Sequence, residues 1–216
     1  MIKERREISP AESGYTLVEA LVVMLIFGVV FATIMGVLIQ VSYSAADNMT
    51  RASQVRNAEL GLMQIDRQVR SGNVILDPDE EKFEDSGVIS GNSLRVFTQT
   101  DGVHKCVQWR IRIGDESRGK LEYRSWDPDW DIFDAEVSDW SVVAHDLVAS
   151  PNGKPAFTKA NEYSWSQNGE TSSINVEIFV QAENTRSAPT AVRTTLTGRN
   201  TVYGYPVGRC DSIPAP

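Results

Sequence analysis

The sequence predicts an α+β fold in which a long N-terminal helix packs on an antiparallel β-sheet head. Three observations lead to this prediction. An uncharged apolar run extends from Ala20 to Ile39, and an amphipathic helical pattern follows it. Further along the chain, apolar and polar residues alternate in several short segments, which is typical of strands that have one face buried.

The composition is that of a globular protein, because 41% hydrophobic and 23% charged residues exclude a disordered chain. The net charge is −8 and the basic residues are scattered. We therefore expect no nucleic-acid partner, since phosphate binding requires clustered Lys and Arg. The motifs GxSxG, GxGxxG and the P-loop are all missing from the sequence. We predict a protein that is not an enzyme and has no cofactor.

The apolar run has the length of a membrane-spanning helix. Its twenty residues would extend about 30 Å as a helix, which is the thickness of a bilayer core. The basic residues before it (Lys3, Arg5 and Arg6) favour a cytoplasmic N-terminus under the positive-inside rule. We therefore expect a single-pass protein of the cytoplasmic membrane, with its head outside the cytoplasm.

Two conventional explanations of the run are weaker. A secretory signal peptide has an apolar region of about 7 to 15 residues, although "SYSA" and "SAA" after the run would accommodate its cleavage. A plain signal anchor requires no processing motif. Neither explanation accounts for the Gly14–Tyr15 junction or for Glu19, a carboxylate at the edge of the run.

The segment "GYTLVEA" resembles the N-terminal signal of type IV pilins and of the pseudopilins of type II secretion. The resemblance implies that a prepilin peptidase cuts between Gly14 and Tyr15 and then methylates Tyr15. It also implies that Glu19, at mature position five, meets the N-terminal ammonium of a neighbouring subunit. The family usually has Phe where this chain has Tyr15. The alternative role of Glu19 is that of an interfacial carboxylate that reaches the lipid headgroups.

The resemblance also implies a pilin-like fold and a division of the chain. We expect a leader peptide (1–14), a transmembrane half of the helix (15–41), an amphipathic half (42–72) and a β-rich head (73–216). The partners would be the membrane, the prepilin peptidase and other pilin or pseudopilin subunits, in a pilus or pseudopilus.

Two longer segments suggest a finer assignment within that family. The stretches "LGLMQIDRQVRSGNVI" and "TLTGRNTVY" resemble J-type minor pseudopilins and W-type minor pilins. The mature chain of 202 residues (216 minus 14) would be long for a major subunit.

In the amphipathic half, apolar residues recur at spacings of three, four or seven: Ala45, Ala52, Val55, Ala58, Leu62, Ile65 and Val69. Such a stripe suits either a coiled-coil seam or packing on the chain's own sheet, and we favour the sheet. Ser71-Gly72-Asn73 is a helix-stop signal, so we expect the helix to end there.

The strands of the head are predicted from alternation. Residues 94–96 and 107–113 alternate, with Gln108, Arg110 and Arg112 on the polar face of the second segment. Residues 121–123 would return across the turn "GDESRG", and a second pair would join 174–180 to 192–196. We expect residues 77–92 to form an acidic loop, and the tail to fray after Cys210.

The segment "WDPDWDIFDAE" contains the candidate metal ligands Asp127, Asp129 and Asp131, followed by Asp134. Hard cations such as Ca²⁺ prefer several oxygens from one loop. The EF-hand pattern fails, because Ile132 occupies its sixth position and Ser138 its twelfth. The alternative is a solvated acidic loop above Trp126 and Trp130, and we expect no metal.

The two cysteines, Cys106 and Cys210, lie beyond the apolar run and would be exported to an environment that permits a disulfide. Cys106 precedes a predicted strand, and Cys210 lies in a tail rich in Pro and Gly. We predict that they form one disulfide; the alternative is two unrelated buried thiols.

Three functions remain at this stage. The favoured function is a minor pilin or pseudopilin with a structural role in a filament. The alternative from another class is a signal-anchored extracellular enzyme or sensor with an unrelated β fold, which would gain nothing from the processing motif. A DNA-uptake or adhesion subunit is a third, although the acidic charge disfavours direct DNA binding.

Overall fold

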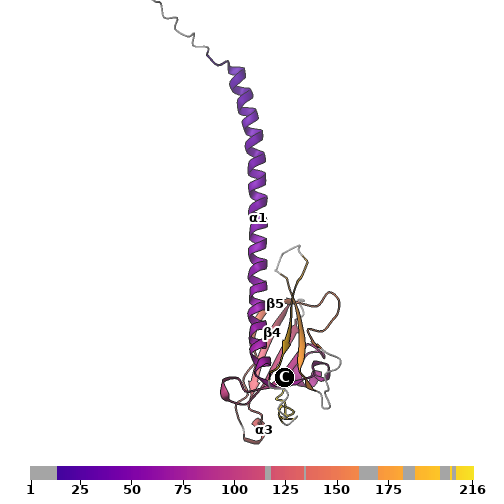
Figure 1. Cartoon of the computed structure of the whole chain (residues 1–216). Helices are drawn as coiled ribbons and strands as arrows, with labels where there is room; N and C mark the ends of the chain where they lie inside the picture. Colours follow the sequence, from indigo (N-terminus) through magenta and orange to yellow (C-terminus); the bar gives the residue numbers. More distant parts are fainter. Residues whose placement is uncertain are drawn as a thin grey trace, which may run out of the picture. The chain divides into compact units, whose positions relative to one another are not determined.

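The computed structural model describes residues 14–114, 118–133, 135–160, 170–181, 188–199, 205 and 208–216. It divides into two compact units, one up to Asn48 and one from Met49 to Pro216, the head. Helix α1 (Leu17–Arg70) contributes to both units (Figure 1). It ends one residue before the predicted stop, where the Ser71 hydroxyl donates to the carbonyl oxygen of Arg67 at 2.9 Å.

In the first unit, every described residue is exposed. Helix α1 contains a window with a mean hydropathy of 2.9, and none of that window is buried. By length and composition this helix can cross a membrane, and a helix that is apolar on all sides requires apolar surroundings.

The head contains an antiparallel sheet with the strand order β6-β8-β5-β4-β3-β2-β1-β7, and β9 also pairs with β8. Its strands are β1 (Gly72–Leu76), β2 (Ser93–Thr98), β3 (Lys105–Ile113), β4 (Gly119–Trp126), β5 (Ser141–Val148), β6 (Phe157–Lys159), β7 (Glu170–Thr171), β8 (Ser173–Val180) and β9 (Thr190–Thr197). The α+β prediction is confirmed, and the architecture is pilin-like.

Both predicted hairpins are present. Strands β3 and β4 pair from Cys106↔Trp126 to Ile113↔Gly119, and β8 pairs with β9 over its whole length. Strand β5 was not predicted, because its register against β4 shifts twice and its alternation is broken. Asp146 within it has φ 61°, a left-handed conformation that few residues other than glycine adopt.

Within the described ranges, four short helices connect the strands: η1 (Pro78–Glu80), α2 (Phe83–Ser86), η2 (Thr100–Gly102) and α3 (Trp130–Phe133). Residues 77–92, the predicted acidic loop, connect β1 to β2 and are more ordered than a plain loop. That segment contains η1 and α2, and it buries Asp77, Glu81 and Ser86. The Asp77 side chain accepts a hydrogen bond from the Asp79 N–H at 3.0 Å, so this carboxylate caps η1.

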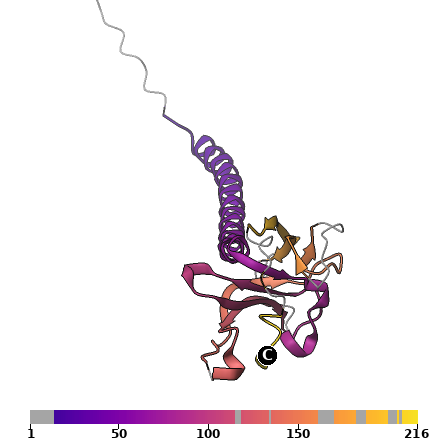
Figure 2. The same cartoon turned by 60° about the horizontal axis from the view of Figure 1, so that its bottom comes forward.

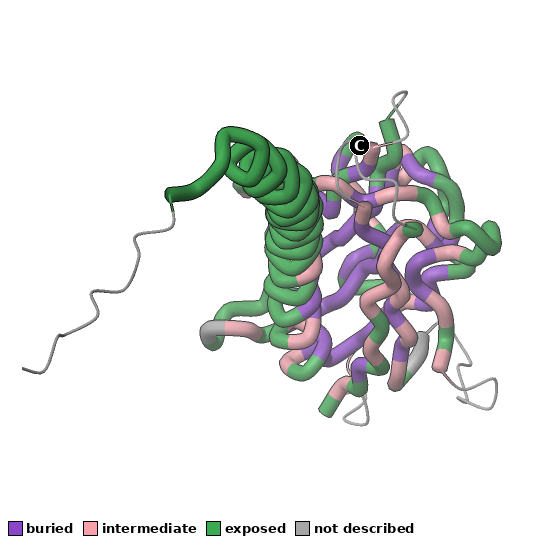
Figure 3. Tube along the Cα trace, turned by 90° about the horizontal axis from the view of Figure 1, so that it is seen from above, coloured by how far each residue is buried: buried purple, intermediate pink, exposed green. Residues whose placement is uncertain are grey.

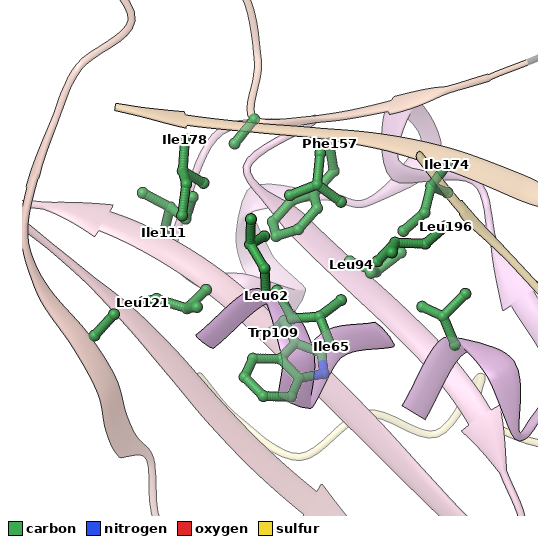
Figure 4. Packing of buried hydrophobic residues seen from close by; sticks show 14 of the residues in the cluster. Leu62, Ile65, Leu94, Trp109, Ile111, Leu121, Phe157, Ile174, Ile178 and Leu196 are labelled. Carbon is green, nitrogen blue, oxygen red and sulfur yellow. The ribbon is translucent and has the colours of Figure 1, made fainter. Parts of the chain in front are cut away.

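One stripe of α1 packs on the apolar face of the sheet (Figures 3 and 4). Ala58, Leu62, Ile65 and Val69 are buried there, as the spacing predicted. Gln54 and Gly61 are also buried and were missed. A Cβ at Gly61 would lie 2.9 Å from the Leu121 side chain, so this glycine allows the helix to approach the sheet closely.

The stripe is shorter than the spacing predicted. Ala45 and Ala52 are exposed, because the packed part of α1 begins at Gln54. The polar face of β3 is also only partly exposed. Gln108 and Arg110 are buried on this face, whereas Arg112 is exposed.

Candidate functional site

The predicted processing junction lies at the start of α1. The carbonyl oxygen of Thr16 accepts from the Ala20 N–H at 3.2 Å, and the Thr16 hydroxyl accepts from the Glu19 N–H at 3.3 Å. Thr16 is therefore the N-cap, and Glu19 is the third helical residue, as in a capping box. A carboxylate in the first turn stabilises a helix by about 0.3–1 kcal/mol through the helix dipole, so Glu19 also has a local role.

Gly14 has no packing reason to be glycine. A Cβ at this position would meet no atom within 4 Å, and its φ does not lie in the left-handed range. The same holds for Gly28 in the apolar part of α1. The chain's own described contacts therefore leave the residue type at position 14 unconstrained.

Glu19 is the only charged residue of α1 before Asp47. Among the described residues, no cation forms an ion pair with its carboxylate. A carboxylate in an apolar helix is costly in a membrane unless it reaches the interface or an opposite charge. Within one copy of the chain, the described residues therefore supply no cationic partner for Glu19.

The comparison with known families matches this segment. Residues 10–35 match the model of the prokaryotic N-terminal methylation motif. The match contains Gly14, Tyr15 and Glu19, and it supports the type IV pilin and pseudopilin family. No curated protein and no solved structure matches the chain. The methylation motif thus opens directly into a helix that can cross a membrane.

Beyond the methylation motif, the head contains the predicted disulfide. Cys106 and Cys210 are bonded, with Cα atoms 5.7 Å apart and 104 positions between them in the sequence. That Cα separation lies within the usual range of 4.4–6.8 Å. Both cysteines are buried beside Val74, Phe97 and Trp126. The bridge attaches the last residues of the chain to β3.

The prediction that the tail frays after Cys210 was wrong. The described residues 208–216, here called the C-terminal strap, lie across the polar face of the sheet (Figure 2). Arg95 Nη1 donates to the carbonyl oxygen of Cys210 at 2.6 Å. Arg124 donates to the carbonyl oxygens of Ala215 at 2.6 Å and Pro214 at 3.0 Å.

Under the strap lies a buried charged cluster. Arg95 pairs with Glu81 at 2.8 Å, and Arg110 pairs with Glu122 at 2.7 Å. Burial raises the pKa of Glu81, and the Arg95 guanidinium opposes that rise only in part. Arg124 is the fifth residue of this cluster, beside the two ion pairs. Within the described part of the chain, Arg124 forms no ion pair of its own.

Arg124 is held by neutral partners. It donates to Gln108 Oε1 at 2.7 Å, and its guanidinium lies 4.4 Å from the centroid of the Trp140 ring. Burial, and then repulsion from Arg110, lower its pKa to about 10. From alternation alone, Gln108 and Arg110 belong to the polar face of β3. This face is buried because segments that are distant in the sequence cover it.

The three candidate metal ligands are engaged in other contacts. The Asp127 carboxylate accepts from the Asp129 N–H at 2.9 Å, Asp129 lies 3.6 Å from Arg209, and Asp131 accepts from the Ser212 hydroxyl at 2.8 Å. Asp134 lies outside the described residues. Within the described part of the chain, no group of three or more His, Cys, Asp or Glu could hold a metal ion. Two of the three carboxylates contact the strap.

Proposed function

We propose that this chain is a minor pilin or pseudopilin subunit of a type IV pilus or a type II secretion pseudopilus. A prepilin peptidase would cut it between Gly14 and Tyr15 and methylate Tyr15. One observation carries the proposal: the methylation motif at residues 10–35 opens a helix whose part up to Asn48 is apolar and exposed, with Glu19 as its only charge before Asp47.

The cut gives Glu19 a specific chemical role. It creates an ammonium on Tyr15, four positions before Glu19. Opposite charges attract strongly where water is excluded, so this ammonium and the Glu19 carboxylate of a neighbouring subunit would stabilise each other. Both groups are costly in hydrocarbon alone, and the pair would therefore fix the axial register of adjacent helices.

The features of the head support export. The Cys106–Cys210 disulfide suits an oxidising compartment, and the basic residues of the leader favour a cytoplasmic N-terminus. The function is then structural. The membrane-spanning half of α1 would join the filament, while the head would contact other subunits.

Processing is tested by the mature N-terminus. Intact mass or N-terminal sequencing of the membrane-extracted protein should give a start at a methylated Tyr15. Gly14→Val should block the cut, because the peptidase requires a small residue there. Gly28→Val is the matched control, since Gly28 also has open space around its Cβ position and lies downstream of the cut. This control variant should be processed normally.

Two results would overturn the proposal. A start near Ala46 would indicate a conventional signal peptidase, and an uncut chain in cells that contain a prepilin peptidase would indicate a plain signal anchor.

A further inference from the structure

The head presents two adjacent apolar side chains on the short helix α3. Ile132 is 70% exposed and Phe133 is 75% exposed. We call this pair the α3 knob. The segment is held in place because Trp130 Nε1 donates to the carbonyl oxygen of Ser212 at 3.0 Å, in the disulfide-bonded C-terminal strap. Single exposed apolar residues are common, whereas here two large ones adjoin each other on a segment that is held in place.

The head also contains an apolar pocket of about 210 Å³. Its apolar lining comes from β3, β5 and β8 and the segments beside them, and includes Ile111, Ile113, Leu147, Ala149, Ile178 and Phe179. Pockets for drug-sized ligands are usually about 300–1,000 Å³. This pocket is smaller, and it suits a single large apolar side chain.

The knob and the pocket lie at opposite ends of the same strands. The α3 knob follows the end of β4, where Trp126 pairs with Cys106. The pocket lies at the other end of this hairpin, where Ile113 pairs with Gly119 and Gly119 pairs with Leu147. Seven residue steps of about 3.4 Å separate the two ends, a distance of roughly 24 Å. The knob therefore cannot enter the pocket of its own head.

The charges around the two features are complementary. Exposed carboxylates flank the knob at Asp127, Asp131 and Glu136. Lys154 lines the pocket, is exposed, and forms no ion pair within the described part of the chain. The carboxylate at the pocket, Glu177, is already engaged by Arg193 at 2.7 Å.

We propose that the α3 knob of one copy inserts into the apolar pocket of a second copy of this chain. The contact is heterologous, because it joins two different surfaces, and each copy keeps one free knob or one free pocket. The inference deepens the proposed function by naming a second copy as the neighbour in the filament, and it rests on that function.

The contact is tested by cross-linking the full-length chain in membranes. One tagged population contains Phe133→Cys and a differently tagged population contains Ala149→Cys, at an exposed position of the pocket lining. Both native cysteines are in the disulfide, so each introduced thiol is the free one. A short bis-maleimide should give a mixed dimer in co-expressing cells, and much less dimer when either population is alone.

Three further variants separate the contact from general misfolding. Ile132→Asp, added to the Phe133→Cys chain, should abolish the mixed dimer. Val142→Asp is the control, because Val142 is 51% exposed on β5 and lines neither feature. Lys154→Glu should lower the yield severalfold, whereas Lys154→Arg should keep it. Tryptophan fluorescence of each variant checks that the head is folded.

Failure of this contact and failure of the proposed function are distinguishable. A start at Tyr15 with filament co-assembly, but without the mixed dimer, overturns the knob-and-pocket contact alone. A mixed dimer that Ile132→Asp leaves unchanged, or a cross-link only to a different protein, overturns it as well. Loss of processing at Tyr15 counts against the proposed function instead.

Discussion

The two units of the chain use apolar residues in opposite ways, although one helix contributes to both. Leu38, in the unit up to Asn48, is 53% exposed, whereas Leu62, in the head, is 6% exposed. The head covers its own apolar stripe with a sheet. The first unit has apolar side chains on all sides and no such cover among its described residues. The first unit therefore depends on a membrane or on neighbouring helices, while the head is stabilised from within.

The largest effect should follow from changing the first unit without disturbing the head. Glu19→Val should insert into the membrane normally, because removing a carboxylate from an apolar helix cannot weaken insertion. Co-assembly with other subunits should be lost, since the neighbour's ammonium would have no partner. Recovery in sheared filaments or in cross-linked complexes measures assembly, and the unfolding temperature of the head should not change.

Thr33→Val is the matched control in the same helix. The Thr33 hydroxyl donates to the carbonyl oxygen of Val30 at 2.7 Å, so it is satisfied within its own helix. This variant should assemble like the wild type. Normal assembly of the Glu19→Val variant would remove the proposed pairing and leave the helix-capping role.

The disulfide should have the largest single effect on the stability of the head. Its removal with Cys106→Ser and Cys210→Ser frees a connection across 104 positions. The chain-entropy model assigns about 4–5 kcal/mol to a loop of that length, and measured losses are about 2–5 kcal/mol. Denaturant unfolding in detergent measures the loss, and membrane insertion should be unaffected. The wild type, denatured without reductant, should show no free thiols; two free thiols per chain would contradict the bridge.

Two neighbouring positions of α1 test the difference between its faces within the head. Ile65 is fully buried, and Ile65→Ala should lower the free energy of unfolding by roughly 3 kcal/mol through lost burial and a cavity. Met63 is 66% exposed, so Met63→Ala should change it by at most about 0.5 kcal/mol. Equal effects in denaturant unfolding would mean that α1 packs on the sheet with a different face.

The smallest effect should be a pH dependence from the buried charged cluster. Burial raises the pKa of Glu81 above its ordinary value of 4.5 in the folded head. A folded state that holds this proton more tightly gains stability at low pH, and the gain is lost as the pH rises through the raised pKa. As the pH rises above 4.5, the wild type should therefore lose free energy of unfolding relative to the Glu81→Gln variant, which has no carboxyl group to ionise. Urea unfolding at several pH values measures the difference. If the wild type instead gains free energy of unfolding relative to the variant as the pH rises, the Arg95 ion pair outweighs burial.

Local patterns in the sequence were sufficient for several features. The methylation motif, the long helix and both hairpins follow from short-range order: a seven-residue segment, an uncharged run, and alternation in 107–113 and 174–180. The cysteine pairing followed from export and from the count of two. The first three features depend on residues that are close in sequence, and two cysteines allow only one pairing within the chain.

Only the tertiary structure decided which polar residues are buried. Alternation shows that Gln108 and Arg110 share a face of β3, but it does not show whether a second layer covers that face. The cover comes from residues 77–92 and from the C-terminal strap, whose carbonyl oxygens accept from Arg124 across about ninety positions of sequence. A guanidinium is stable in that place only because those distant oxygens satisfy its N–H groups, and no local pattern records that contact.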